Sequence, residues 1–267
     1  AFVAKADLLA ASPAYSDQSG VDWKTAAASA AKVLNHIGGV DGMDPTGWTW
    51  YCNVDDIEKL SPTESPAEIL WRGERAKSLS LEEDNFPPTL YGNGRINPTQ
   101  NLVDAFPMLN GYPVSHLSGE YDENLPYANR DPRLEAYILY NGCKAGNTAA
   151  DGTTNDALNK VVGRSTRTGY YLRKLLRQDI SLDPNAKADQ YHYTPRIRYT
   201  EIFLAYAEAA NQAYGPQDKG GNGYSAYDVV KKLRHRAGIG RDNGDAYLES
   251  IKNDQAKMAE LIRNERR

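Results

Sequence analysis

The sequence predicts a mainly α-helical protein, in which a tetratricopeptide-like helical-repeat scaffold carries an irregular, loop-rich subdomain with a few short strands. Two observations predict this class. Apolar residues recur at helical spacing only near the two ends of the chain. Between these ends, Gly, Pro, Asn and Asp are frequent and periodic stretches are short. We therefore expect a helical hairpin at 1–39, an irregular, loop-rich subdomain at 40–195, and more of the helical scaffold at 196–267.

The first unit should contain two helices. Residues 1–11 are rich in Ala and Leu, and Pro13 breaks them because the residue before a proline is pushed out of the helical region. Asp22 is placed to cap the second helix, and Gly38 to end it. One apolar face at helical spacing is formed by Trp23, Ala26, Ala27, Ala30, Val33, Leu34 and Ile37.

Only short helices and strands are predicted in the middle of the chain. A helix is expected at 98–106, with Asn97 as its cap and Pro98 in its first position. The best strand candidates are residues 68–71, 134–140 and 170–176.

Helices return after residue 195. The stretch 199–214 has a stripe of Ile and Ala, Ser225 caps a helix that runs through Arg236, and Asp245 opens a last helix that continues to the end. These helix pairs are similar in kind to tetratricopeptide units, although the loops between them are enlarged and no clean 34-residue period results.

Composition and charge exclude several classes of function. Lys plus Arg number 31 and Asp plus Glu 35, which gives a formal net charge of −4. Dedicated nucleic-acid binders normally carry a basic excess, and docking on anionic lipid requires one as well. No apolar run approaches the length of a membrane-spanning helix. We expect neither a nucleic-acid partner nor a membrane span.

Metal and redox chemistry have little support. Cys52 and Cys143 lack zinc-site spacing, and they form either one disulfide or two unpaired buried thiols. The histidines have no ligand-pair spacing; they are His36, His116, His192 and His235. The acidic segments 41–44 and 151–156 contain oxygen donors but match no EF-hand loop, so loop capping is the preferred interpretation. No cofactor is expected, and a structural calcium ion is left open.

Catalysis is not predicted either. The carboxylate clusters at 55–56, 82–84 and 122–123 are sequence neighbours on polar loops, whereas a glycosidase needs two carboxylates that face each other across a cleft. We interpret them as solvated loops, and we expect no enzyme.

Aromatic residues are more informative. The chain has 18 Tyr and 4 Trp but only 4 Phe, so most rings carry a polar tip. Trp48, Trp50 and Tyr51 follow a segment rich in turn formers, and Tyr91 lies between two prolines and a Gly-Asn-Gly turn. Exposed rings of this kind can stack on sugar rings while polar neighbours bind the hydroxyls. The alternative is that the rings replace aliphatic residues in packing the irregular middle.

Seven motifs, in order along the chain, together resemble the SusD/RagB family of outer-membrane nutrient-binding lipoproteins. They are NPTQNLVDAF at 97–106, NGYP at 110–113, NRDPRL at 129–134, TGYYLRK at 168–174, RYTEIFLAYAEA at 198–209, LRHRAG at 233–238 and IRNERR at 262–267. The resemblance implies the same tetratricopeptide-like fold. It also implies that this chain lacks the lipid-bearing cysteine and the segment that usually follows the last motif.

The resemblance also implies a role. Such proteins are lipid-anchored at the cell surface, capture oligosaccharides or polysaccharides, less often peptides, and deliver them to a SusC-like TonB-dependent transporter. Binding residues lie outside the shared motifs in such families, which indicates Trp48, Trp50, Tyr51, Tyr91 and Arg95, with Trp71 as a further candidate although its strand favours the core. The alternatives are a peptide-binding member of the same scaffold and a helical-repeat module that binds only a protein partner.

The motif residues themselves are interpreted as scaffold. Arg198, Glu201 and Glu208 lie on one predicted helix, and Arg234 and Arg236 lie on the next, so Arg–Glu pairs between the helices would fix their register. Asp131 and Arg133 are expected to form a charge pair at a turn.

Overall fold

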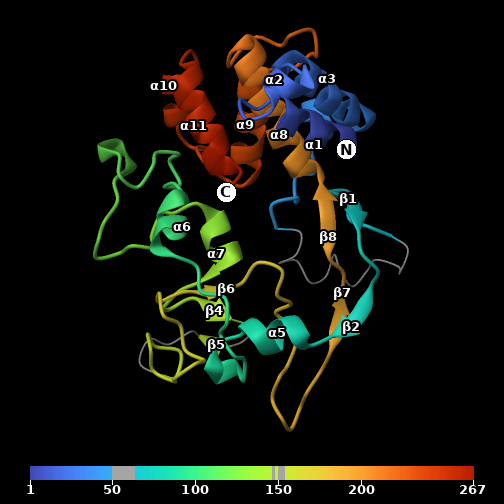
Figure 1. Ribbon diagram of the computed structural model, residues 1–267. Coiled ribbons are helices and arrows are strands. Elements are labelled where there is room, and N and C mark those ends of the chain that lie inside the picture. Colours follow the sequence, from blue (N-terminus) through green and yellow to red (C-terminus); the bar gives the residue numbers. More distant parts are fainter. Residues whose placement is uncertain (50–63, 146–147, 150–153) are drawn as a thin grey trace.

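The computed structural model describes residues 1–49, 64–145, 148–149 and 154–267. Helices from both ends of the chain pack into one core (Figure 1). Its centre is helix α8 (Tyr199–Tyr214), which contacts four other helices. These are α1 (Phe2–Ala10), α3 (Trp23–Leu34), α9 (Ala226–Arg236) and α11 (Gln255–Glu265). The expected mainly helical class is confirmed.

Small residues let these helices approach closely. In α3 the alanines at 26, 27, 30 and 31 are all buried, and in α8 those at 205, 207, 209 and 210 are buried as well. Short side chains along both faces leave little between the two backbones, so α3 and α8 form the most extensive helix pair in the core. The apolar face expected on the second helix is therefore confirmed, and it packs against α8.

Side-chain caps set most helix starts. The carboxylate of Asp22 accepts a hydrogen bond from the Thr25 N–H, and Ser225 forms a reciprocal capping box with Asp228. The expected single helix after Asp245 is wrong. Asp245 caps α10 (Ala246–Ile251), and Asp254 then caps α11 as a new start, so a short break separates the two helices.

Short helical pieces lie in the loops and in the irregular middle. The segment between α1 and Asp22 contains α2 (Ser16–Ser19), and 3-10 turns η1 (Asn35–Ile37) and η2 (Gly39–Gly42) follow α3. The middle contains α5 (Ser80–Asn85), η3 (Pro88–Leu90), α6 (Gln100–Ala105), η4 (Leu117–Gly119) and α7 (Pro132–Tyr137). Thr99, rather than the expected Asn97, caps α6.

Four antiparallel two-stranded sheets complete the described chain. They are β1 (Ile69–Arg72) with β8 (Pro195–Arg198), β2 (Ala76–Ser78) with β7 (Gln190–His192), β3 (Ile138–Leu139) with β6 (Tyr171–Leu172), and β4 (Lys144–Ala145) with β5 (Thr148–Ala149). The first two sheets form a ribbon that leads away from α8 (Figure 1).

Two strand expectations need correction. The stretch expected as a strand at 134–140 is helical up to Tyr137, because Asp131 caps it and Pro132 starts it; only Ile138 and Leu139 pair as a strand. The strand expected at 170–176 is reduced to Tyr171–Leu172.

Separate small apolar clusters stabilise the irregular middle, in contrast to the single core of the helices. Cys143 lies in one of them as a buried free thiol, and burial raises its pKa. Cys52 lies outside the described residues. Within the described part, no helix is long and apolar enough to cross a membrane.

Candidate ligand-binding site

Tyr91 is displayed on a loop that leaves the end of α5. We call residues 86–95 the Tyr91 loop. Its turn η3 begins with Pro88, and Tyr91 itself has a left-handed backbone with φ of 64°. The side chain is 52% exposed. A bulky residue held in this conformation stores strain, and such strain gathers at functional sites.

Backbone hydrogen bonds fasten this loop to α5. The N–H groups of Asn93 and Arg95 donate to the carbonyls of Glu83 and Asp84, both at 2.9 Å. The Gly94 N–H donates to the carbonyl of Phe86, whose ring is buried. The turn around Tyr91 is therefore closed on itself and anchored to a small core.

A second segment supports the same loop from the other side. The Arg164 guanidinium donates to the Gly92 carbonyl at 2.8 Å, and the Thr89 N–H donates to the Asp156 carboxylate at 3.0 Å. Gly94 has a φ of +53°, and a Cβ at this position would collide with the Arg164 carbonyl. The close approach requires glycine, and it holds the Tyr91 backbone rigidly.

Polar groups accompany the exposed ring. Arg95 forms a 3.1 Å ion pair with Asp84, and both side chains remain largely open to solvent. A half-exposed tyrosine with a guanidinium on the same loop and a carboxylate on the preceding helix α5 can stack on a sugar ring and exchange hydrogen bonds with its hydroxyls. Among the expected site residues that the structure describes, Tyr91 and Arg95 lie on one loop.

Trp48 lines a different feature. A cleft of about 590 Å³ lies between the irregular middle and the helices, and Trp48 forms part of its wall. The Tyr137 hydroxyl donates to the Trp48 carbonyl. The cleft has a mixed lining, with apolar side chains such as Ile96, Leu102, Phe106, Leu175 and Leu204 and charged ones such as Lys174 and Arg196.

Trp71 was expected to lie in the core, and this expectation is wrong. Its side chain is 50% exposed, and it belongs to the two-stranded ribbon that β1 forms with β8. Its ring packs against Phe2 of α1, with the ring centroids 5.2 Å apart. Trp50 and Tyr51 lie outside the described residues. The structure thus distributes Trp48, Trp71 and Tyr91 over three separate features.

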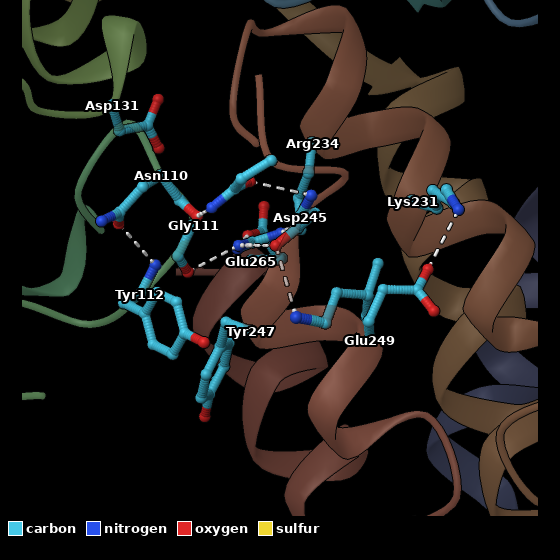
Figure 2. Close-up of polar contacts among 12 residues, drawn as sticks. Asn110, Gly111, Tyr112, Asp131, Lys231, Arg234, Asp245, Tyr247, Glu249 and Glu265 are labelled. Carbon is cyan, nitrogen blue, oxygen red and sulfur yellow. Dashed lines mark hydrogen bonds and ion pairs between the residues drawn. The ribbon is translucent and has the colours of Figure 1, made fainter. Parts of the chain in front are cut away.

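A buried ion-pair network joins the irregular middle to the helices (Figure 2). The Arg234 guanidinium on α9 binds Asp245 and Glu265, and its Nη2 also donates to the Gly111 carbonyl at 2.7 Å. Arg133 binds Glu265 at 2.7 Å and Asp131 at 2.8 Å. The expected Asp131–Arg133 pair is present, and it belongs to this network.

The expected Arg–Glu pairs between α8 and α9 are wrong. Glu201 binds Lys5, and Glu208 binds Arg266. Their partners lie on α1 and at the end of α11, which pack on α8 as α9 does.

Arg198 and Arg236 instead bind a carboxylate that was not expected from the sequence. Glu68, fully buried before β1, binds Arg198 at 3.2 Å and Arg236 at 3.5 Å, and it accepts the Thr200 N–H at 3.0 Å. The sequence offered no signal for this, because Glu68 is 130 residues from Arg198.

A second buried carboxylate was also missed. Glu82 is fully buried, and its Oε1 lies 2.9 Å from His192 Nε2 and accepts the Arg177 N–H at 2.8 Å. Its neighbours Glu83 and Asp84 bind Lys187 and Arg95. The acidic run at 82–84 therefore supports local structure. Among the described residues, no group of three or more His, Cys, Asp or Glu side chains is placed to hold a metal ion.

Comparison with solved structures finds similar folds. A SusD-like protein of Bacteroides fragilis, BF3747, is 25% identical with a TM-score of 0.64. A SusD-like carbohydrate binding protein of the same organism, BF0978, is 19% identical with a TM-score of 0.57; each alignment covers 92% of this chain and 48% of the other. The protein BT4246 is 15% identical with a TM-score of 0.66, over 98% of this chain and 58% of the other.

The chain thus spans about half the length of the first two of these proteins. A comparison with curated proteins finds no match. The model of the SusD family matches residues 70–267, which is most of the chain and includes the Tyr91 loop and the buried ion-pair network. This chain is a member of the SusD family.

Proposed function

We propose that the protein binds oligosaccharides and that the Tyr91 loop is a contact surface for them. The observation that carries the proposal is the exposed Tyr91 ring, held at a left-handed backbone position by hydrogen bonds from two sides. A rigid ring loses little conformational entropy when a ligand stacks on it. Arg95 on the same loop and Asp84 on α5 supply a donor and an acceptor, and they pair with each other at 3.1 Å.

The similarity to a protein described as carbohydrate binding supports a sugar as ligand. By the family resemblance, we further propose that the intact protein is lipid-anchored at the cell surface, acts without catalysis and passes its ligand to a SusC-like TonB-dependent transporter. Trp48, Trp50, Tyr51 and Trp71 stay candidates for further contacts.

The first test is affinity electrophoresis of the intact protein through gels that contain starch, xylan, mannan, inulin or pectin. We expect one polysaccharide to retard the protein. Tyr91→Ala should weaken that retardation about tenfold, since lost stacking costs on the order of 1–3 kcal/mol in comparable base–ring contacts. Tyr91→Phe should retain it.

Tyr15→Ala serves as the matched control, because Tyr15 is also a half-exposed tyrosine but lies on the helical scaffold. Retardation that is unchanged in Tyr91→Ala would remove the loop from the site. If none of the polysaccharides retards the protein, the proposal of glycan binding is overturned.

The mixed lining of the Trp48 cleft favours peptides as the second candidate ligand. Apolar side chains beside Lys174 and Arg196 suit a chain with alternating apolar and acidic residues. If the polysaccharide gels fail, binding of a casein digest measured by calorimetry would support this alternative, and Trp48→Ala should weaken it.

A further inference from the structure

Three aromatic rings meet where the segment after α6 contacts α10. The ring centroids of Tyr112 and His116 are 4.7 Å apart, those of Tyr112 and Tyr247 5.6 Å, and those of His116 and Tyr247 6.3 Å. We call these three residues the ring cluster. Figure 2 shows the two tyrosine rings side by side below the Arg234 ion pair.

The ring cluster is held rigidly by the buried network. The Tyr112 N–H donates to Asn110 Oδ1 at 3.2 Å, and the Asn243 amide donates to the Asn110 carbonyl at 2.8 Å. The neighbouring Gly111 carbonyl accepts from Arg234. Tyr247 belongs to α10, whose first turn is capped by Asp245, the partner of Arg234. Both tyrosines are thus positioned by the same ion pair.

The polar atoms of the ring cluster are available to a ligand. Within the described part of the chain, neither the Tyr112 nor the Tyr247 hydroxyl has a protein hydrogen-bond partner. His116 is exposed, and its Nδ1 accepts the Ser118 N–H at 3.1 Å. The neutral imidazole must therefore carry its proton on Nε2, and this N–H group can donate a hydrogen bond to a ligand.

Packing alone does not account for the arrangement. Tyr112 belongs to none of the buried apolar clusters, and Tyr247 lies only at the edge of the helical core. Leu117, next to His116, is almost completely exposed, so this side chain does not cover the rings. Ring faces, two hydroxyls and an imidazole donor together match the apolar face and the hydroxyls of a sugar.

We propose that the ring cluster is a second sugar-binding surface, separate from the Tyr91 loop and able to bind a neutral oligosaccharide. The inference rests on the proposed glycan-binding function, and it departs from the expectation that motif residues such as Tyr112 of NGYP serve only as scaffold. The cluster adjoins α10 at the helical end of the molecule, whereas the Tyr91 loop follows α5 at the opposite end (Figure 1). A long glycan that engaged both surfaces would gain avidity, because the second contact becomes intramolecular.

The test observes His116 directly by proton NMR of the intact protein. The chain has four histidines, so His116→Gln assigns the imidazole signal by its loss. The probes are maltoheptaose, xylohexaose, mannohexaose and chitohexaose. One of them should shift the His116 signal, and the shift should persist in Tyr91→Ala. Tyr247→Ala should weaken the affinity measured at this signal about tenfold.

Two further variants keep the test clear. Tyr247→Phe retains the ring and its packing, and it should weaken binding only a few-fold, whereas Tyr15→Ala should leave the titration unchanged. Calorimetry measures total binding in parallel. A probe that binds in a Tyr91-dependent manner but leaves the His116 signal unmoved overturns the second surface and retains the proposed function. A His116 shift that vanishes in Tyr91→Ala also overturns it. If none of the probes binds, both the second surface and the proposed glycan-binding function are overturned.

Discussion

Arg234 and Asp245 form a bidentate ion pair whose side chains are both 0% exposed, with Nε–Oδ2 and Nη2–Oδ1 distances of 2.6 and 3.0 Å. The pair joins the end of α9 to the start of α10. Through the Gly111 carbonyl it also holds the segment that carries Tyr112. One ion pair therefore links the helical core to a part of the irregular middle.

Removal of one partner should be strongly destabilising. Asp245→Asn leaves the buried guanidinium with Glu265 as its remaining anion, and breaking a buried pair typically costs about 3–5 kcal/mol. Urea unfolding followed by circular dichroism measures the loss. Glu249→Gln is the control, because Glu249 and its partner Lys231 are 35% and 38% exposed, and such pairs contribute at most about 1 kcal/mol. If both variants lost the same free energy of unfolding, the stabilising role of the buried Arg234–Asp245 pair would be contradicted.

Stability should fall in acid because of Glu265. Burial acts to raise the pKa of this carboxyl group, but the charges of Arg133 and Arg234 outweigh it and lower the pKa from 4.5 to about 2. A group whose pKa is depressed by folding stabilises the protein above its unfolded pKa. That contribution, about 3 kcal/mol, should be lost as pH falls from about 4.5 to about 2.

Urea unfolding at a series of pH values measures this dependence. Glu265→Gln cannot titrate, so the variant should be less stable than the wild type at neutral pH and should lose less stability on acidification. A variant with the wild-type pH profile would show that Glu265 is not the titrating group.

Gly111 should not tolerate a side chain. It has a φ of +95°, and a Cβ there would collide with Asp245 Oδ1 and approach Arg234 Nη2 to 3.0 Å. Gly111→Ala should therefore cost about 2 kcal/mol or more, as the sum of backbone strain and displacement of the ion pair. Gly169→Ala is the control, because Gly169 has a φ of +89° but open space around it. Its cost should be near 1 kcal/mol, and thermal unfolding compares the two.

Tyr91 should show a trade-off between stability and binding. Glycine adopts φ of 64° without the steric penalty of a tyrosine, so Tyr91→Gly should stabilise the folded protein by up to about 1 kcal/mol. The same substitution should weaken retardation in the polysaccharide gel about tenfold, as expected for Tyr91→Ala. Urea unfolding and affinity electrophoresis of one preparation check both effects. A variant that loses stability and retains binding would contradict the role of the ring.

Glu120→Gly is the matched control for this trade-off. Glu120 also has a left-handed backbone, with φ of 59°, but it lies outside the Tyr91 loop. The variant should gain similar stability, and its retardation in the gel should not change.

Much of the fold could be predicted from the sequence because its signals are local. Asp22 and Ser225 cap helices where expected, since a cap acts within one turn. The failures also have local causes. Asp254 restarts a helix inside a continuous apolar pattern, and the Asp131 cap makes the stretch after it helical before a strand.

The site was only partly predictable. Tyr91 was expected to be displayed, because prolines and glycines on both sides constrain the turn, and its ring is exposed. Trp71 was expected in the core and is exposed, since a strand pattern does not tell which face another layer will cover. The ring cluster was not foreseen, because Tyr112 and Tyr247 are distant in sequence and meet only through packing.

By itself, the sequence determined the helical ends, their caps, the irregular middle and the motifs that indicate the SusD family. Those properties depend on spacing and on interactions within a turn. Only the tertiary structure decided that Arg234 pairs with Asp245 and Glu265, and that Glu68 binds Arg198 and Arg236. The partner of a buried charge depends on which elements pack around it, and that follows from the whole chain at once.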